Sequence, residues 1–194
     1  SRGLGDVYKR KAIVGVTYIF SYLGLGVLQS NRADVAGKFL AKERGHEGIK
    51  LTVKPSFGNL ILWKTIYEDN GYYYVDAVRL LSEVENCPGT KIKKLNVASD
   101  FPNLKQNSQQ FKDIKRFYWF SQDYLGLAND KNVITDVRYS AVPNEVDGLW
   151  GIKIDPLKNN NQHVEWVVNR SEYKVKLNKF LDLLLGKNCI KEIN

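Results

Sequence analysis

The fold is decided by residues 60–81, which read LILWKTIYEDNGYYYVDAVRLL. Two runs rich in aromatic and β-branched residues flank Glu68-Asp69-Asn70-Gly71, a composition typical of strands joined by a turn. Asn-Gly accepts positive φ at both turn positions, so the tetrapeptide predicts a tight hairpin. The two strands, Leu60–Tyr67 and Tyr72–Leu81, must then pair antiparallel.

More strands are expected on both sides of this hairpin. Upstream, Ile49–Val53 alternates apolar and polar residues, a period of two that predicts a strand. Downstream, Val133–Tyr139 begins a second group, in which Leu149–Ile154 and His163–Val168 predict another hairpin. Between the groups, residues 82–108 are rich in Lys, Asn, Ser, Pro and Gly and predict a long excursion with little regular structure.

Two amphipathic helices are also expected. One runs from about Gln109 to Phe120, and the other from about Ser171 to Leu185 with Gly186 as its stop. The elements together predict an α+β fold. It consists of an antiparallel curved sheet of about six strands packed on a long N-terminal helix, with a second helix mid-chain and a C-terminal helix.

The N-terminal helix contains an uncharged stretch of 18 residues, Ala12–Gln29, which reads AIVGVTYIFSYLGLGVLQ. Lys9-Arg10-Lys11 precedes it and Arg32 follows it, so the flanking charge does not fix an orientation in a membrane. One interpretation is a short transmembrane helix, because the stretch is at the lower length limit for spanning a bilayer. The other is a buried helix that continues through residues 33–40 at helical spacing.

The chain therefore divides into three parts. Residues 1–11 are a basic leader or a remnant of cloning, since the sequence contains no Met even at position 1. Residues 12–44 form the long apolar helix, the possible last transmembrane helix of a longer parent protein. Residues 45–194 form a single soluble α+β domain. The helix is the expected contact with a membrane, through the parent chain, and residues 12–44 are also the expected surface for a homo-oligomer.

Composition excludes several classes of protein. The chain has 194 residues, of which 43% are hydrophobic and 26% charged, which excludes a disordered or collagen-like chain. The two cysteines, Cys87 and Cys189, are too few for a disulfide framework or a cysteine zinc site. The net charge of +8 suits nucleic acid, an anionic membrane or an acidic ligand, or simply a solvated surface. The basic residues are scattered and no nucleic-acid motif accompanies them, so no specific nucleic-acid partner is indicated.

Residues able to bind a metal or to act as a nucleophile do not cluster along the sequence. The two histidines, His46 and His163, are far apart and have no second ligand at metal-binding spacing. There is no G-x-S-x-G, and Gly24-Leu25-Gly26 lacks the third glycine of a dinucleotide site. We therefore expect no metal and no cofactor bound by this chain, and both histidines are expected to be ordinary polar residues.

One turn is expected to position a tryptophan on the sheet. Pro55 presets φ and lacks an N–H, so it belongs at the end or the edge of a strand. Gly58 allows a positive φ, and the Asn59 side chain can bind local backbone. This turn would deliver the second strand into the sheet and bring Trp63 onto one sheet face.

A candidate polar pocket follows from this turn. Asp136 and Arg138 are two residues apart, so they share one face of a strand. If a ligand pocket exists, we expect it beside Trp63, with charge from Asp136 and Arg138 and further polar groups from His46 and Asn59. The alternative, which we favour, is that Trp63 is a core residue and that the Asp136–Arg138 pair faces solvent.

Several short segments in order resemble the C-terminal region of the bacterial membrane-bound metal-dependent hydrolase-like proteins, an inner-membrane family of the YdjM and YbcI types. The resemblance covers residues 10–155. The segments that carry it are RGH (44–46), VKPSFGN (53–59), LWK (62–64), GYYY (71–74), FYWFS (117–121), TDVRY (135–139) and LWG (149–151).

The resemblance implies a function for a longer protein. Members of this family have a part with several membrane helices and a proposed histidine-containing metal motif, followed by a soluble C-terminal domain. No residue here matches that motif, so a divalent metal would belong to the full-length parent. The chain would be the soluble domain of a bacterial inner-membrane hydrolase, with an accessory or substrate-access role and no complete active site of its own. The alternative is a non-enzymatic module that binds a ligand or a lipid headgroup.

Overall fold

The predicted hairpin at Asn70-Gly71 forms the second and third strands of one antiparallel sheet in the computed structural model, which describes residues 2–128, 132–169 and 172–191. The chain order of the strands is also their order across the sheet from β1 to β8, and β9 pairs with β4. The strands are β1 Leu51–Pro55, β2 Leu62–Asp69, β3 Tyr72–Leu80, β4 Val84–Lys94, β5 Leu125–Leu127, β6 Val133–Asp136, β7 Trp150–Lys153, β8 Glu165–Val168 and β9 Ile190–Lys191. The helices are α1 Arg2–Glu43, α2 Val97–Asp100, α3 Gln109–Ser121 and α4 Tyr173–Leu184.

The α+β class and the antiparallel sheet are confirmed, but the expected number of about six strands is wrong, because the described residues form nine. Two of the additional strands are very short. β5 has three residues and β9 has two, which is too few for a periodic pattern to be visible in a sequence. The third is β4, which is long but does not have the composition that predicts a strand.

Strand β4 occupies part of the stretch for which the sequence predicts an irregular excursion. Its eleven residues include Pro88-Gly89, which usually indicates a turn. Here the register between β3 and β4 shifts between Val75 and Ala77, and Pro88-Gly89 lies in the resulting irregularity. The backbone N–H of Gly89 donates a hydrogen bond of 2.7 Å to the carboxylate of Asp76. The two residues therefore mark a bulge inside a strand rather than its end.

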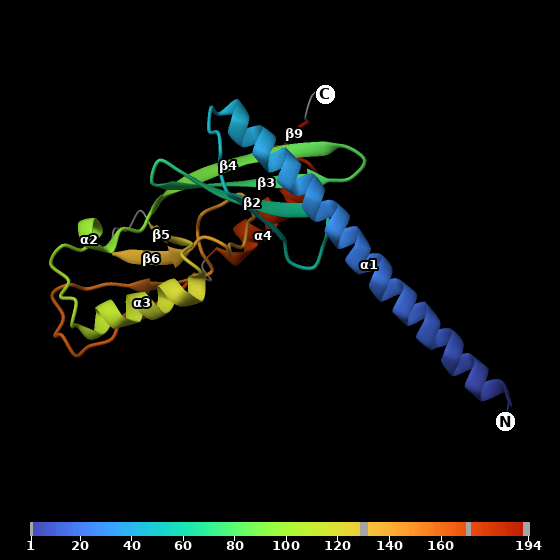
Figure 1. The fold of residues 1–194 in the computed structure, drawn as a ribbon, viewed down its shortest axis with the longest axis horizontal. Helices are drawn as coiled ribbons and strands as arrows, with labels where there is room; N and C mark the ends of the chain where they lie inside the picture. Colours follow the sequence, from blue (N-terminus) through green and yellow to red (C-terminus); the bar gives the residue numbers. More distant parts are fainter. Residues whose placement is uncertain (1, 129–131, 170–171, 192–194) are drawn as a thin grey trace.

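Helix α1 crosses the sheet with its C-terminal half and projects away from it with its N-terminal half (Figure 1). Ala33 and Ala36 are buried against the sheet, whereas residues 12–28 are almost all exposed. The interpretation of a buried helix therefore holds for the C-terminal half of α1 and not for the apolar stretch that precedes Gln29. Gly45, with a φ of 78°, follows the last turn as a glycine cap should.

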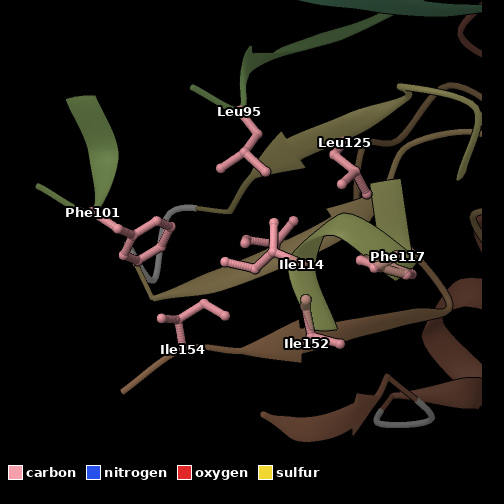
Figure 2. Close-up of a cluster of buried hydrophobic side chains, with 8 residues drawn as sticks. Leu95, Phe101, Ile114, Phe117, Leu125, Ile152 and Ile154 are labelled. Carbon is pink, nitrogen blue, oxygen red and sulfur yellow. The ribbon is translucent and has the colours of Figure 1, made fainter. Parts of the chain in front are cut away.

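Helix α3 covers the second group of strands and closes a separate core (Figure 2). Ser108 caps its N-terminus by accepting a hydrogen bond from the N–H of Phe111, and Gln122 ends it in the left-handed conformation. The buried residues of this core are Leu95, Phe101, Ile114, Phe117, Leu125, Ile134, Ile152 and Ile154. The helix therefore fixes β5, β6 and β7 as a unit.

Helix α4 and the last strand return to the first group of strands. Leu183 of α4 is buried with Leu62 and Ala77, on the sheet face opposite α1. A disulfide joins Cys87 of β4 to Cys189, which lies 102 residues later and directly before β9. Two cysteines thus form one long-range crosslink, which the sequence did not predict. Residues 170–171, where the sequence places the start of the last helix, lie outside the described residues.

Candidate functional site

The structure does not bring the five residues of the expected pocket together. Trp63 is only 3% exposed and packs with Ala33 and Ala36 of α1, so it is a core residue. Its indole N–H donates a hydrogen bond of 2.9 Å to the carbonyl of Leu60. The charge of Asp136 acts on Lys64, the next residue of β2, whose side chain lies on the opposite face of the sheet from Trp63.

The Asp136–Arg138 pair is buried, which contradicts the expectation that it faces solvent. The guanidinium donates hydrogen bonds of 2.7 and 2.9 Å to the two carboxylate oxygens of Asp136. It also donates to the carbonyl of Phe120 and to the side chain of Gln122, at the C-terminal end of α3. The bond to Asp136 is the main reason that the pKa of Arg138 is raised. The pair therefore holds α3 on the sheet, which only the tertiary structure could show.

Asn59 has the structural role that its turn predicts. Its side-chain oxygen accepts hydrogen bonds from the N–H groups of Ile61 and Leu62, at 3.0 and 2.8 Å. Gly58 has a φ of 71°, and Pro55 is the last residue of the edge strand β1. The expected turn is confirmed, and its function is to start β2.

His46 belongs to a polar cluster on another part of the sheet. Its Nδ1 lies 3.0 Å from the hydroxyl of Tyr67, and its ring packs on Tyr74. Beside it, Arg44 donates hydrogen bonds of 2.7 and 2.8 Å to the carboxylate of Asp76. This bond is the main reason that the pKa of Arg44 is raised. The cluster fixes the segment after α1 on the sheet.

A groove of about 780 Å³ lies between α3 and the β7–β8 hairpin. Aromatic side chains form much of its wall. Trp119 is 83% exposed and Trp166 is 65% exposed, which is unusual for residues of this size. Phe117 is buried, and its ring lies 5.9 Å from that of Trp166 and nearly perpendicular to it. The sequence showed the aromatic residues of α3 but could not place Trp150 and Trp166 across from them.

Asp113 and His163 form a hydrogen-bonded pair in the lining of this groove. His163 Nδ1 lies 2.8 Å from the Asp113 carboxylate, which also accepts from the Gln109 amide and from the N–H of Val164. Burial acts to raise the pKa of Asp113, but these hydrogen bonds outweigh it and lower that pKa. The carboxylate is therefore ionised near neutral pH, so Nδ1 carries the proton. Fifty residues separate the pair, and no local spacing predicted it.

The second feature with functional potential is the projecting half of α1. Among the described residues, α1 is the one helix long and apolar enough to cross a membrane, judged by length and composition, and only 6% of its most apolar stretch is buried. It leaves the sheet at Gln29, whose side-chain amide donates hydrogen bonds to the carbonyls of Leu60 and Leu80. Arg32 follows it and donates to the carbonyl of Leu81 at 2.9 Å. These bonds fix the direction in which the apolar half projects.

The described ranges contain no group of three or more His, Cys, Asp or Glu side chains able to hold a metal ion. The metal that the family resemblance implies therefore has no ligand set in this part of the chain. No family model, no curated protein and no solved structure matches the chain.

Proposed function

We propose that the chain is the extramembrane domain of a membrane-bound protein, anchored through α1. The observation that supports this is the surface of the N-terminal half of α1, where consecutive helical turns are apolar and exposed. Apolar surface left in water costs about 25 cal/mol per Å², so this half needs an apolar environment. The exposed apolar side chains include Ile13, Val14, Val16, Ile19, Phe20, Leu23, Leu25, Val27 and Leu28.

The length of the segment fits a bilayer. The 18 uncharged residues Ala12–Gln29 span about 27 Å as a helix, at 1.5 Å per residue. The hydrocarbon core of a bilayer is about 30 Å thick. Another exposed apolar residue, Leu81, lies where α1 leaves the sheet, because Arg32 binds its backbone carbonyl. This end of the sheet is suited to face the membrane surface.

The chemistry of the chain favours one orientation in that membrane. Disulfides such as Cys87–Cys189 form in oxidising compartments and are rare in the cytosol. Lys9-Arg10-Lys11 lies at the other end of the apolar stretch, and lysine and arginine favour the cytoplasmic side. Arg32 and Arg44, which follow the stretch, are engaged by the folded domain. The domain would then lie on the outer face of a bacterial inner membrane.

In this setting we assign the domain an accessory role, as the resemblance implies. It would shape substrate access or assembly of a metal-dependent hydrolase whose metal ligands lie elsewhere in the parent protein. The test of this role is the parent protein itself. Its hydrolysis should need the upstream membrane part and a divalent metal, and removal of the present domain should change KM or assembly rather than metal binding.

The anchoring is tested by extraction and by topology. The chain, expressed in a bacterial host, should stay in the membrane pellet after alkaline carbonate treatment. A double Ile19→Arg and Phe20→Arg variant should become soluble, whereas Val35→Arg, an exposed site in the packed half of α1, should not. A C-terminal alkaline phosphatase fusion should be active. A soluble wild-type chain would refute the anchor, and an inactive phosphatase fusion would refute the orientation.

A second candidate function is the binding of a small apolar molecule in the aromatic groove. Its volume of about 780 Å³ lies within the range of small-molecule sites. An aromatic ligand would fit the groove, because Phe117, Trp119 and Trp166 line it. Asp113 and His163 would then determine its orientation.

The groove is tested with anilinonaphthalene sulfonate as the probe and the chain in lipid nanodiscs. Trp119→Ala and Trp166→Ala should each weaken binding of the probe at least several-fold relative to wild type. Tyr173→Ala removes a similarly exposed aromatic ring on α4 and should have no effect. Equal binding by all four proteins would exclude the groove as a site.

A further inference from the structure

Lys64 is a buried lysine without a carboxylate partner. It lies within β2, and the residue is 4% exposed. Its Nζ donates hydrogen bonds of 2.8 Å to Ser140 Oγ and 2.9 Å to the carbonyl of Glu145. Among the described residues, no carboxylate oxygen lies within 4.0 Å of Lys64 Nζ, which is the distance limit for an ion pair. A buried ammonium without a counter-ion is unfavourable, so this position favours the neutral amine.

The environment sets the protonation state of this amine. Burial lowers the pKa of Lys64 to about 7, and the charges of Asp136 and Glu145 oppose this only in part. In a large fraction of the molecules, Lys64 is therefore unprotonated at neutral pH. A neutral amine beside a hydroxyl can act as a general base, which an ordinary surface lysine cannot do at this pH.

Lys64 and Ser140 line the same small cavity, of about 80 Å³. Lys54 and Tyr139 line it as well, and the Lys54 ammonium donates a hydrogen bond of 3.1 Å to the Tyr139 hydroxyl. Arg138, paired with Asp136, also lines it, so the cavity combines a hydroxyl, an adjacent amine and two cations. Its volume accommodates only a short acyl group.

We propose that Ser140 and Lys64 form a nucleophile and general-base pair that hydrolyses carboxylic esters with a short acyl group. This activity is distinct from the accessory role proposed above and does not need a metal. In the resting state the Ser140 hydroxyl donates to the carbonyl of Val142 at 2.6 Å. Rotation about the Cβ–Oγ bond redirects its proton toward Lys64 Nζ.

The reaction proceeds in two balanced halves. Ser140 Oγ attacks the carbonyl carbon while its proton moves to neutral Lys64, and the Lys54 ammonium stabilises the oxyanion. The carbon–oxygen bond to the alcohol then breaks, and Lys64 returns the proton to the departing alkoxide. Water then attacks the carbonyl carbon of acyl-Ser140 while Lys64 takes one of its protons. The bond between the acyl carbon and Ser140 Oγ breaks, Lys64 gives the proton to Oγ, and the carboxylic acid is released. The net reaction is ester plus water to acid plus alcohol.

The hydrogen bonds of Lys64 to Ser140 and Glu145 also hold the segment after β6 on β2. The test must therefore measure chemical reactivity as well as stability. The probe is p-nitrophenyl acetate, with the full chain in nanodiscs and a chelator present. Acid quenching should trap an acetyl group on the peptide that contains Ser140. The acetylation rate should rise with pH around a midpoint of about 7, which is the pKa of the base.

Three variants distinguish the role of each group. Ser140→Ala should abolish the adduct, and Lys64→Arg, which keeps a charged donor but no usable base, should slow acetylation about 100-fold or more. Ser121→Ala, which removes another buried hydroxyl, should acetylate as wild type. If a variant fails to fold, the wild-type adduct map still decides. No adduct at Ser140 between pH 7 and 9 would overturn the proposal, and an unchanged rate in Lys64→Arg would overturn the role of the lysine.

Discussion

The side-chain amide of Gln29 donates a hydrogen bond of 3.1 Å to the backbone carbonyl of Leu80, where α1 meets the end of β3. A second bond of 3.2 Å goes to the carbonyl of Leu60. This contact separates the packed half of α1 from the projecting half, because Gln29 is buried and Leu28 is exposed. It is the joint between the proposed anchor and the domain.

Gln29→Leu should therefore destabilise the domain. The change leaves two backbone carbonyls without their donor, and a buried group left unsatisfied costs about 1–3 kcal/mol. The measurement is the free energy of unfolding in denaturant, with the chain in nanodiscs. Leu28→Ala, one residue earlier on the exposed half, is the control and should change the value by less than about 0.5 kcal/mol. Equal effects of the two changes would mean that Gln29 does not fix the helix.

Gly37→Leu should displace α1 from the sheet. A Cβ at Gly37 would lie 2.7 Å from the Leu51 side chain and 3.1 Å from that of Thr65, so a larger side chain has no space. Overpacking of this kind costs about 1–3 kcal/mol, and we expect a lower melting temperature by circular dichroism. Gly24→Leu is the matched control, because nothing lies within 4 Å of a Cβ there. A melting temperature unaffected by Gly37→Leu would contradict the packing of this half of α1.

Loss of the Cys87–Cys189 bond should reduce stability by about 2–5 kcal/mol, because it closes a long loop in the unfolded chain. The double variant Cys87→Ala and Cys189→Ala should melt at the temperature of the reduced wild-type protein. Reductant should lower the melting temperature of the wild type and leave the double variant unchanged. If reductant has no effect on the wild type, the crosslink does not form in the protein as expressed.

The Asp113–His163 pair should make stability sensitive to acid. The pKa of Asp113 is lower in the folded state than its ordinary value of 3.8, so the unfolded state binds its proton first as the pH falls. The contribution of ionised Asp113 to the free energy of unfolding is thus fully present above about pH 4. It disappears as the pH falls through the lower pKa of the folded state. Urea unfolding should be measured between pH 2 and pH 6. As the pH falls, the free energy of unfolding should decrease less in Asp113→Asn than in the wild type. Parallel curves for the two proteins would show that this carboxylate does not contribute.

The chain should show no metal-dependent hydrolysis. Neither His46 nor His163 belongs to a group of three or more metal-ligating side chains in the described residues, since the carboxylate beside His46 is that of Asp69 and the one beside His163 is that of Asp113. Addition of zinc or manganese should therefore not activate the chain, and calorimetry should detect no stoichiometric binding. Tight binding of either metal that disappears in His46→Ala would show that a site exists.

Local sequence predicted those features whose interactions lie within a few residues. The Asn70-Gly71 turn and the Pro55–Asn59 turn formed as expected because their φ requirements and hydrogen bonds are satisfied inside the turn. The helix expected from about Gln109 to Phe120 formed at Gln109–Ser121, because its apolar period is also a local feature. Of the candidate pocket, only Asn59 had a role that such local reasoning could identify.

The tertiary structure decided the rest, because it depends on pairs far apart in the chain. Lys64 and Ser140 are 76 residues apart, and Asp113 and His163 are 50 apart, so no spacing along the sequence relates them. Composition determined that an apolar helix of membrane-spanning length would exist. Which half of that helix meets the sheet depends on the fit of its small residues Ala33, Ala36 and Gly37 and on the bonds of Gln29, whose partners are in place only when the sheet has formed.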